Sequence, residues 1–401
     1  MEIAYIHQYF RTPEDGGAIR SFYIAKALTE RGHNVHVITA HNAPHRREHN
    51  CSGFKVYYLP VPYRNEYGFW RRVWSFMHFA FLAYRMARKL RPLDLCYVSS
   101  TPLSVGLPAL RLLKTLSVPF IFEARDLWPE APVGLGVLNN RVLIALARKL
   151  EYRLYSKAIS VIALSPPAAE YIRQKNPEAV VHLVTNMADC DYFAPSENFI
   201  PPGPQAPFTI AYTGALGYVN NVEYLLHAAS ACRKAGLPLN LVIAGDGAQL
   251  DFLQQKAAEM QLQNITFTGH LGKDGVRKAL NGSHAACISF RPEPVLQYSS
   301  PNKLFDAMAA GKAIITNTGG WIRQLVEDEN IGFYCDPESP ETLAVLVERY
   351  YRDPQLLYDQ QRNSRKQAEH RYSRTQMCSR LADIVENSVF RAQSVRQGTV
   401  L

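Results

Sequence analysis

The chain has 401 residues, of which 47% are hydrophobic and 20% are charged, and its formal net charge is +9. This length suits two or three domains, and this composition excludes a mostly disordered, collagen-like or coiled-coil chain. Residues 1–165 contain 22 Lys and Arg against 11 Asp and Glu, whereas residues 166–401 contain 22 against 24. The basic N-terminal part predicts an anionic partner, either a nucleic acid or a membrane surface.

The cellular location is predicted from three further features. No run of ~18–20 apolar residues is present, so no membrane-spanning helix is expected. The opening MEIAYI lacks the basic segment and cleavage site typical of a signal peptide. The seven cysteines are dispersed without a C-x-x-C pair, which favours reduced thiols over disulfides or a zinc cluster. We therefore expect a cytoplasmic protein.

Short apolar strands alternate with amphipathic helices in two successive parts of the chain, which predicts an α/β fold with parallel sheets. In the first part we expect a helix at 18–32, ending on Gly32, and strands at 2–9, 34–41, 55–61, 93–100, 119–124 and 158–164. In the second part we expect a helix at 220–236 and strands at 208–214, 239–245, 265–269, 285–290 and 312–317.

A linker and a helical tail complete the predicted organisation. The segment APSENFIPPGPQAPF contains five prolines and no helical periodicity, so the domain boundary is expected near residues 195–207. The tail is predicted to form three helices, at 341–353, 354–372 and 374–390.

The segment SSPNKLFDAM at 299–308 predicts a helix with Ser300 as N-cap and Pro301 in the first position. Its first turn would offer backbone N–H groups and the positive end of the helix dipole to a diphosphate. Lys303 would add a full charge, and Asp306 could accept hydrogen bonds from ribose hydroxyls. The expected contacts of the helix start are Ser300, Asn302, Lys303 and Leu304. The alternative is an ordinary capped surface helix.

Two glycine turns follow expected strands. Gly16 and Gly17 would let the backbone approach a ligand closely, although a plain tight turn explains them equally well. The turn at 245–247 reads Gly-Asp-Gly and matches only part of G-x-G-x-x-G, so it is weak evidence for a nicotinamide cofactor.

In the segment FEARDLWPE, Glu123 and Asp126 flank Arg125 directly after an apolar strand. Functional residues of α/β proteins gather at strand ends, so Asp126 is predicted to act as a base or to orient an acceptor hydroxyl. The alternative is a structural ion pair between Arg125 and a neighbouring carboxylate.

Residues 63–91 contain seven Lys and Arg, one acid and nine aromatic residues. The apolar run VWSFMHFAFLAY would be about 18 Å long as a helix, which is too short to span a bilayer. Basic residues beside tryptophans suit a helix that lies in an anionic membrane surface, and the alternative is a helix packed on the sheet with a solvated basic edge. The residues of this predicted membrane face are Trp70, Arg71, Arg72 and Trp74.

The chain resembles retaining family 4 glycosyltransferases over nearly its whole length. The motifs that carry the resemblance follow in the expected order: HQYF, GGAIRS, AKALTERGHNVHVITA, EARDLWPE, VIAGDG, ITFTGHL, SPNKLFDAMAAGKAII and TNTGGWI. The most similar subgroup builds O-antigen and capsule sugars and includes fucosamine-transferase-like enzymes.

The resemblance implies a GT-B architecture with two facing Rossmann-like domains and no metal cofactor. Residues 1–195 would form the acceptor-binding domain and residues 206–370 the nucleotide-sugar-binding domain. A C-terminal helix at about 372–392 would return to the first domain. The helix dipole and cations would neutralise the donor diphosphate in place of a metal.

The resemblance also implies roles for individual residues. Gly16 and Gly17 match the glycine loop beside the donor phosphates. The backbone of His270 and Leu271 matches the nucleobase contact. Asp306 stands where the second glutamate of the E-x7-E pattern binds ribose. Asp126 lies in the segment where many relatives carry a catalytic-site histidine.

The chain departs from the family pattern at the expected donor site. Tyr298 replaces the first glutamate of E-x7-E, and Glu293 is the nearest acid that could substitute for it. Ala215 and Tyr218 stand where relatives often carry an Arg and a Lys for the diphosphate. The cations left for that task are Lys303 and Arg291.

We therefore expect a retaining glycosyltransferase, peripheral on the inner face of the plasma membrane, that acts in surface polysaccharide synthesis. It would move a sugar from a nucleotide-diphosphate donor, preferably a UDP-sugar, to a polyprenyl-diphosphate-linked saccharide, with no nucleic acid as partner. One alternative is a nucleotide-sugar 2-epimerase, which shares the architecture but needs no membrane face. The other is a non-catalytic partner in polysaccharide assembly, which the departures at the donor site suggest.

Overall fold

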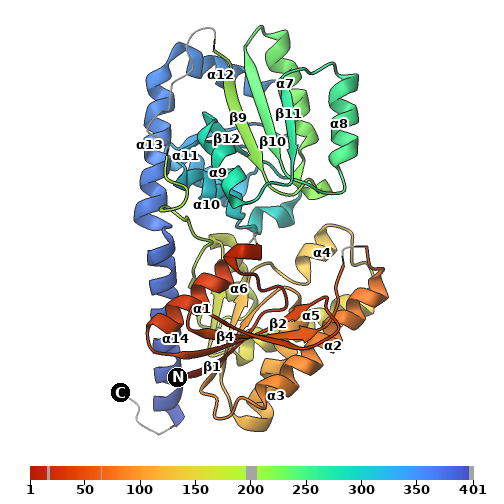
Figure 1. Cartoon of the computed structure of the whole chain (residues 1–401), viewed down its shortest axis with the longest axis vertical. Helices are drawn as coiled ribbons and strands as arrows, with labels where there is room; N and C mark the ends of the chain where they lie inside the picture. Colours follow the sequence, from red (N-terminus) through yellow and green to blue (C-terminus); the bar gives the residue numbers. More distant parts are fainter. Residues whose placement is uncertain (16–18, 65, 196–205, 397–401) are drawn as a thin grey trace. The chain divides into compact units, whose positions relative to one another are not determined.

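The computed structural model describes residues 1–15, 19–64, 66–195 and 206–396 (Figure 1). The chain divides into two compact units, each built around its own sheet. The first unit comprises Met1–Thr185, Tyr298–Ser300 and the residues from Thr375 onward, and the second comprises Asn186–Gln297 and Pro301–Arg374. Two α/β units with parallel sheets were expected from the sequence, and the structure confirms this fold class.

The sheet of the first unit has eight strands in the order β3-β4-β2-β1-β5-β6-β7-β8. All neighbours are parallel except β3 and β4, which form an antiparallel hairpin. The central strands β5, β6 and β7 are buried along their full length, as parallel strands covered by helices on both faces must be. The bounds are β1 Glu2–Ile6, β2 Asn34–His41, β3 Arg47–Cys51, β4 Phe54–Pro60, β5 Leu95–Ser99, β6 Phe120–Ala124, β7 Ser160–Ala163 and β8 Val181–Leu183.

The edge strand β3 was not predicted, because its sequence REHNC has no apolar alternation. The hairpin forms through the two-residue turn Ser52-Gly53, whose φ angles of 47° and 88° fit the left-handed conformation that two-residue hairpin loops need. The formation of β3 is therefore specified by the turn and not by a pattern in the side chains of β3 itself.

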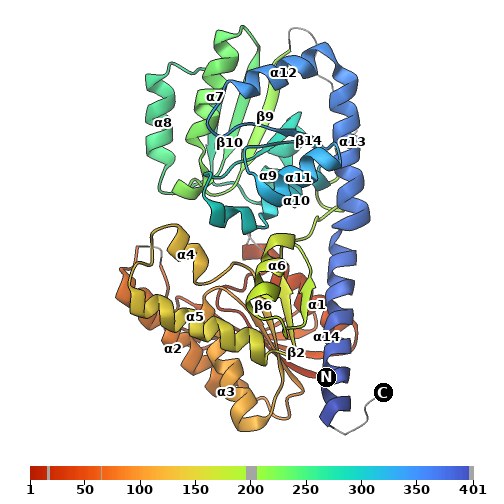
Figure 2. The ribbon, with the colours of Figure 1, turned by 180° about the vertical axis from the view of Figure 1, so that it is seen from behind.

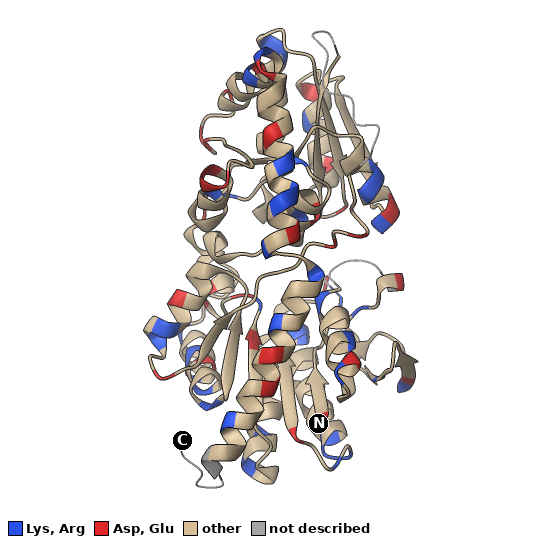
Figure 3. Cartoon of the chain, turned by 90° about the vertical axis from the view of Figure 1, so that its left-hand side faces the viewer, with Lys and Arg blue, Asp and Glu red and all other residues tan. Residues whose placement is uncertain are grey.

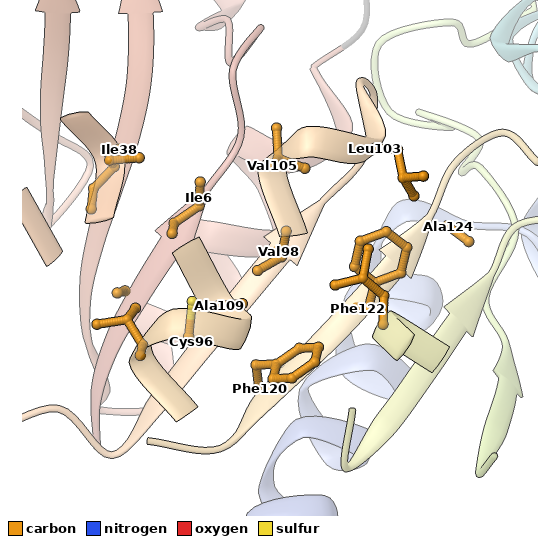
Figure 4. Close-up of a cluster of buried hydrophobic side chains, with 14 of the residues drawn as sticks. Ile6, Ile38, Cys96, Val98, Leu103, Val105, Ala109, Phe120, Phe122 and Ala124 are labelled. Atoms are coloured by element: carbon orange, nitrogen blue, oxygen red, sulfur yellow. The ribbon is translucent and has the colours of Figure 1, made fainter. Parts of the chain in front are cut away.

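Within its described residues the first unit has seven α-helices, and α2, α3 and α5 lie side by side on one face of its sheet (Figure 2). The apolar core lies between that sheet face and these helices, with Val98 of β5, Phe120 and Phe122 of β6 and Ala109 of α3 in contact (Figure 4). The bounds are α1 Arg20–Glu30, α2 Phe69–Ala87, α3 Gly106–Leu116, α4 Glu130–Gly134, α5 Arg141–Lys157, α6 Pro166–Lys175 and α14 Arg374–Arg396, which begins at the last residue of the second unit.

The sheet of the second unit has six parallel strands in the order β11-β10-β9-β12-β13-β14. The three-residue strand β14 was not predicted. The strand bounds are β9 Phe208–Thr213, β10 Leu239–Ala244, β11 Ile265–Gly269, β12 Ala285–Ile288, β13 Ala313–Thr316 and β14 Gly332–Tyr334. The helix bounds are α7 Glu223–Lys234, α8 Leu250–Glu259, α9 Lys273–Asn281, α10 Asn302–Ala309, α11 Gly320–Asp328, α12 Thr342–Arg352 and α13 Pro354–Arg371.

The two C-terminal helices are rich in charged residues of both signs (Figure 3). On α13, Arg365 Nε lies 2.7 Å from Glu369 Oε1, an ion pair one turn apart. On α14, Asp383 and Glu386 accept hydrogen bonds from Arg31, which follows α1, at 2.6 and 3.0 Å. These bonds attach α14 to the first unit. Within the described residues, no helix is both long enough and apolar enough to cross a bilayer.

A buried ion pair fixes α1 to the sheet of the first unit. Arg20, the first residue of α1, donates a hydrogen bond of 2.8 Å to Glu123 on β6, and the Arg20 side chain is 1% exposed. Its other nitrogens donate to the carbonyls of Val184 and Thr185. Burial raises the pKa of Glu123, but the charges of Arg20 and Arg125 and the hydrogen bonds from Ser99 and Arg20 together outweigh this and hold the pKa below its ordinary value. Glu123 is therefore ionised and paired in the folded chain.

We predict that Arg20→Met destabilises the first unit by ~3–5 kcal/mol, because it leaves a buried carboxylate without its cation. The matched control is Arg46→Met, which breaks the solvent-exposed pair of Arg46 with Glu48 and should change stability by no more than ~1 kcal/mol. Denaturant unfolding followed by circular dichroism measures both. Equal effects of the two substitutions would contradict the prediction.

Candidate functional site

The first turn of α10 differs from its predicted geometry. Pro301 is the N-cap, with φ −74° and ψ 133°, and its own side chain makes no capping hydrogen bond. The expectation that Ser300 caps a helix beginning at Pro301 is therefore wrong, because the extended ψ of Pro301 delays the helix by one residue. The N–H of Leu304 donates to the Pro301 carbonyl at 3.2 Å. Contrary to the expectation, this N–H is therefore not available to a ligand. The N–H groups of Asn302 and Lys303 remain the ligand-facing candidates.

Lys303, the second residue of α10, is half-buried, and its side chain reaches the end of β9. Its Nζ donates a hydrogen bond of 3.0 Å to the Tyr212 hydroxyl and lies 4.8 Å from the ring centre of Phe290. The Tyr212 hydroxyl donates its own proton to the Ala215 carbonyl at 2.8 Å, so it can only accept from Lys303. Burial lowers the pKa of Lys303 to about 7, and no carboxylate pairs with it in the described parts of the chain. An anionic ligand would supply the missing partner.

Glycine turns bring two loops together beside Lys303. The N–H of Gly214, after β9, donates to the Ala244 carbonyl at 2.9 Å, and the N–H of Leu216 donates to the Asp246 carbonyl at 2.8 Å. A Cβ on Gly245 would lie 1.8 Å from the Gly214 carbonyl oxygen, so only glycine fits there. The turn at 245–247 thus has a packing role.

Arg291, in the loop after β12, brings a second cation to the same region of the second unit. Its Nε donates to the Tyr218 carbonyl at 3.0 Å, and its guanidinium carbon lies 3.5 Å from the Tyr218 ring centre. The backbone N–H of Arg291 also donates to the Val219 carbonyl at 2.9 Å. A guanidinium therefore lies directly on Tyr218, the residue that stands where related sequences were expected to carry a cation.

Asp306 lies within α10, where its carboxyl is partly exposed. Burial raises the pKa of Asp306 to about 7, with Lys273 lowering it and Asp189 raising it further. Asp189 itself accepts from Lys273 at 2.7 Å and from Arg374 at 2.6 Å. Lys273, the cation that lowers the pKa of Asp306, is thus engaged by Asp189. The Asp306 carboxyl could therefore accept hydrogen bonds from a polar ligand.

The structure also shows where the other residues expected to contact the donor lie. His270 is exposed immediately after β11, and Leu271 is half-buried against α9, where a Cβ on Gly275 would lie 3.0 Å from the Leu271 Cβ. Glu293 is half-buried, and its carbonyl accepts from the Leu296 N–H at 2.9 Å. Their roles toward a ligand stay predictions.

Tyr298, which replaces the expected glutamate, packs in the first unit together with Ser299 and Ser300. Its ring centre lies 5.9 Å from that of Tyr171, and its carbonyl accepts from the Ser165 hydroxyl at 2.6 Å. The position therefore has an aromatic packing role.

In the first unit, Asp126 is exposed directly after β6, and desolvation by the surrounding chain raises its pKa while Arg125 opposes the shift. Arg125 does not pair with Glu123, because Glu123 accepts from Arg20 at 2.8 Å and from the Ser99 hydroxyl at 2.5 Å. Gly16 and Gly17, the predicted phosphate loop, lie outside the described residues.

His7 is a candidate that the sequence analysis missed. It follows β1, is 2% exposed, and its Nε2 lies 3.3 Å from Arg125 Nη1. Burial and the Arg125 charge hold the pKa of His7 well below its ordinary value, so the ring is neutral. Since guanidinium nitrogens only donate, Nε2 accepts and the proton lies on Nδ1. The signal available in the sequence was a polar residue at the end of the first buried strand.

Comparison with known protein families gives two adjoining matches. Residues 15–187 match the glycosyl transferase 4-like domain, and residues 195–369 match the family described as glycosyl transferases group 1. The chain is 25% identical over 248 residues to the probable glycosyltransferase WbjE of Pseudomonas aeruginosa, an alignment that covers 58% of this chain. It spans about 60% of the length of that relative.

Solved structures with the same fold cover nearly the whole chain. Sucrose-phosphate synthase from Thermosynechococcus elongatus has a TM-score of 0.79 at 16% identity, covering 98% of this chain and 99% of its own. HepE from Anabaena, solved with UDP and glucose, has a TM-score of 0.70 at 18% identity, covering 96% and 100%. WaaG, a glycosyltransferase involved in lipopolysaccharide biosynthesis, has a TM-score of 0.66 at 17% identity, covering 95% and 99%. These structures share the GT-B fold with the chain.

We predict that binding of a nucleoside diphosphate such as UDP takes up protons at pH 8. Lys303 has a pKa of about 7, so it is mostly neutral there, and a bound diphosphate favours the charged ammonium. Asp306 is already ionised at pH 8 and contributes little. Calorimetry in two buffers of different ionisation enthalpy should show uptake of up to roughly one proton, and affinity should fall from pH 7 to 9.

The control for this prediction is Lys303→Met, which should abolish the proton uptake. A binding enthalpy of the unsubstituted chain that does not depend on the buffer would show that Lys303 does not contact the diphosphate.

Proposed function

Because the chain belongs to the group 1 glycosyltransferases and has the GT-B fold, we propose that it is a retaining, metal-independent glycosyltransferase. Its donor is a nucleotide-diphosphate sugar, preferably a UDP-sugar, and its acceptor is a polyprenyl-diphosphate-linked saccharide in surface polysaccharide synthesis. The observation that carries the proposal is Lys303, a half-buried cation at the start of α10 that pairs with no carboxylate of the described residues.

The leaving diphosphate is the group that this arrangement suits. As the sugar leaves, negative charge grows on the phosphate oxygens, and fixed cations and dipoles stabilise it most in a partly desolvated site. Lys303 and the N–H groups at the start of α10 supply such a site. Arg291, held on Tyr218, supplies a second charge and replaces the cations that the loop after β9 lacks.

The remaining donor contacts follow the family motif. Asp306, one turn into α10, receives the ribose hydroxyls, and the backbone at His270 and Leu271 contacts the base. HepE, which shares the fold, was solved with UDP and glucose, and this supports a uridine nucleotide as the donor. Glu293 takes the place of the missing glutamate beside the donor sugar.

Asp126 orients the acceptor hydroxyl or relays its proton. Its exposed carboxyl lies at the end of β6, and its raised pKa is suited to accepting a proton. Neutral His7, which accepts from Arg125, holds that guanidinium beside Asp126.

The acceptor is presented at a membrane surface by the membrane face of α2. Trp70 is 73% exposed and Trp74 is 71% exposed, which is unusual for such large apolar side chains unless they meet a partner. Arg71 stacks on Tyr67 with its guanidinium carbon 3.9 Å from the ring centre, and Arg72 donates to the Tyr67 carbonyl at 2.8 Å. Tryptophans flanked by cations suit the headgroup region of an anionic bilayer. The chain would then lie at the inner face of the plasma membrane.

The proposal is tested by incubating the purified full chain with UDP-sugars and polyprenyl-diphosphate-linked saccharides. We expect a lipid-linked product with retained anomeric configuration. Lys303→Ala should weaken UDP binding by about 10-fold or more and leave uridine binding nearly unchanged, because a charge-assisted hydrogen bond is worth ~1.5–3 kcal/mol. The matched control is Lys366→Ala, an exposed lysine on α13.

Two other results would replace the proposal. Release of free epimerised nucleotide sugar without any lipid-linked product would indicate a 2-epimerase. Absence of binding to every common nucleotide sugar by folded protein would indicate a non-catalytic partner.

We predict that Arg71→Glu combined with Arg72→Glu releases the chain from phosphatidylglycerol vesicles in a sedimentation assay, because the substitution reverses the charge of the membrane face. Arg362→Glu combined with Lys366→Glu makes the same change in charge on α13 of the second unit and should leave sedimentation unchanged. Release by both pairs would indicate only a net-charge effect, and release by neither would remove α2 from the membrane contact.

A further inference from the structure

Lys175, the last residue of α6, connects carboxylates of two other helices in the first unit. Its Nζ lies 2.6 Å from Oε2 of Glu151 on α5 and 3.5 Å from Oε1 of Glu130 on α4. The Glu151 side chain is fully buried, and Glu130 also accepts two hydrogen bonds from Arg148, at 2.9 and 3.0 Å. The proposed function uses none of these groups, which form a partly buried ionic cluster.

The same amine reaches an aromatic pair. Lys175 Nζ donates a hydrogen bond of 2.6 Å to the hydroxyl of Tyr171, one turn earlier on α6. The ring centre of Tyr171 lies 5.9 Å from that of Tyr298, and both rings pack against the core of the first unit. The carbonyl of Tyr298 accepts a hydrogen bond of 2.6 Å from the hydroxyl of Ser165, the N-cap of α6. Helix α6 and its N-cap therefore hold Tyr298 through both its ring and its backbone.

The amine of Lys175 has one partner on each of the helices α4, α5 and α6, which matches the three N–H donors of an ammonium group. Burial lowers the pKa of Lys175, but the hydrogen bonds and charges of Glu151 and Tyr171 outweigh this and hold the pKa above its ordinary value. The amine therefore stays charged, and its two bonds of 2.6 Å are of the strong, charge-assisted kind. A shift of α4 or of Tyr171 thus disturbs the contacts of the other through this one group.

One side of this network leads to the loop of Asp126. Glu130 begins α4, and the N–H of the next residue donates to the Leu127 carbonyl at 2.7 Å, so the first turn of α4 reaches back to the residue that follows Asp126. Leu127 is 3% exposed and belongs to the core of the first unit. The position of α4 therefore sets the backbone next to the Asp126 carboxyl.

The other side of the network leads to the start of α10. Tyr298, Ser299 and Ser300 pack in the first unit, and the chain then enters the second unit at Pro301, the N-cap of α10. Only two residues separate Tyr298 from this N-cap, so the backbone between them can absorb little of a displacement of Tyr298. The position of Tyr298 therefore influences the first turn of α10, which carries Lys303.

We propose that Lys175 is a positioning residue that couples the loop of Asp126 to the start of α10. The coupling runs through Glu130 on one side and through Tyr171 and Tyr298 on the other. The inference rests on the proposed function, and it adds a residue through which the acceptor side and the donor side of the reaction adjust to each other. A lysine with a purely structural role would stabilise the first unit and leave α10 unaffected.

The test changes the groups on either side of Lys175, because Lys175→Met would leave Glu151 buried without a cation and strongly destabilise the first unit. Glu130→Leu removes the carboxylate on α4, and Tyr171→Phe removes only the hydroxyl that Lys175 contacts. The matched controls are Glu170→Leu and Tyr152→Phe, which change exposed residues of α6 and α5.

Hydrogen exchange in the full chain without a ligand measures how firmly the start of α10 is held. The amides of residues 304–307 should exchange about three- to tenfold faster in Glu130→Leu and in Tyr171→Phe, and at the unsubstituted rate in both controls. In the background of Tyr298→Ala, neither substitution should raise the exchange further, because the contact that transmits its effect is already lost. Unchanged exchange in both chains, or a further rise in the Tyr298→Ala background, would overturn the coupling whether or not a nucleotide binds.

UDP affinity, measured by isothermal calorimetry on the same preparations, separates this inference from the proposed function. Glu130→Leu and Tyr171→Phe should each weaken UDP binding about threefold or more, and the controls should leave it unchanged. Faster exchange with an unchanged UDP affinity would show that Lys175 supports the fold without positioning the donor site, and would also overturn the inference. Faster exchange in a chain that binds no UDP even when unsubstituted would keep the coupling and reject the proposed donor.

Discussion

The candidate site of the second unit depends on a lysine that is kept partly out of water and that no carboxylate in the described part of the chain neutralises. Lys303 donates to the Tyr212 hydroxyl, whose own proton is committed to the Ala215 carbonyl. The glycine contact between Gly214 and Gly245 holds the loop that carries Ala215. Each of these contacts orients the amine, and none of them neutralises it. A cation in this state has more to gain from an incoming anion than one already paired with a carboxylate.

In the first unit, by contrast, the buried charged and polar groups are paired with one another. Glu123 lies in the middle of the sheet but is fully engaged by Arg20 and Ser99, and neutral His7 accepts from Arg125. These groups set the backbone where β1 and β6 end. The exposed carboxyl at this edge that they leave uncommitted is Asp126. A rigid, internally paired frame beneath a free carboxyl is how an α/β unit can hold a polar group for chemistry without destabilising its sheet.

Most of the fold could be predicted because its strands are short apolar runs and its helices end on recognisable signals. Gly32 and Gly236, expected as helix ends, have φ of 84° and 69°, which glycine adopts without strain. The sequence could not reveal β3, whose pairing comes from a turn. It also could not reveal the pairing of Arg20 with Glu123, because these residues are 103 positions apart and no local pattern connects them.

The candidate site was predicted in part. The features that were not predicted depend, like those of the fold, on contacts and backbone angles that no local sequence pattern shows. Lys303 and Arg291 were identified as cations, but they are held by the Tyr212 hydroxyl of β9 and by the Tyr218 ring in the loop after β9, 91 and 73 positions away in the sequence. The start of α10 was misplaced by one residue, because the sequence pattern Ser-Pro fits two cap geometries and only the ψ angle of Pro301 distinguishes them.

The edge strand β3 of the eight-stranded sheet has a consequence for the behaviour of the chain in concentrated solution. A free strand edge is a template on which another molecule can add a strand, which is the first step toward fibrils and amorphous aggregates. The exposed side chains of β3 include Arg47, Glu48 and His49. A second copy that paired with β3 would have to bury these polar groups. The polar sequence that prevented the prediction of β3 therefore also disfavours the addition of a further strand to this edge of the sheet.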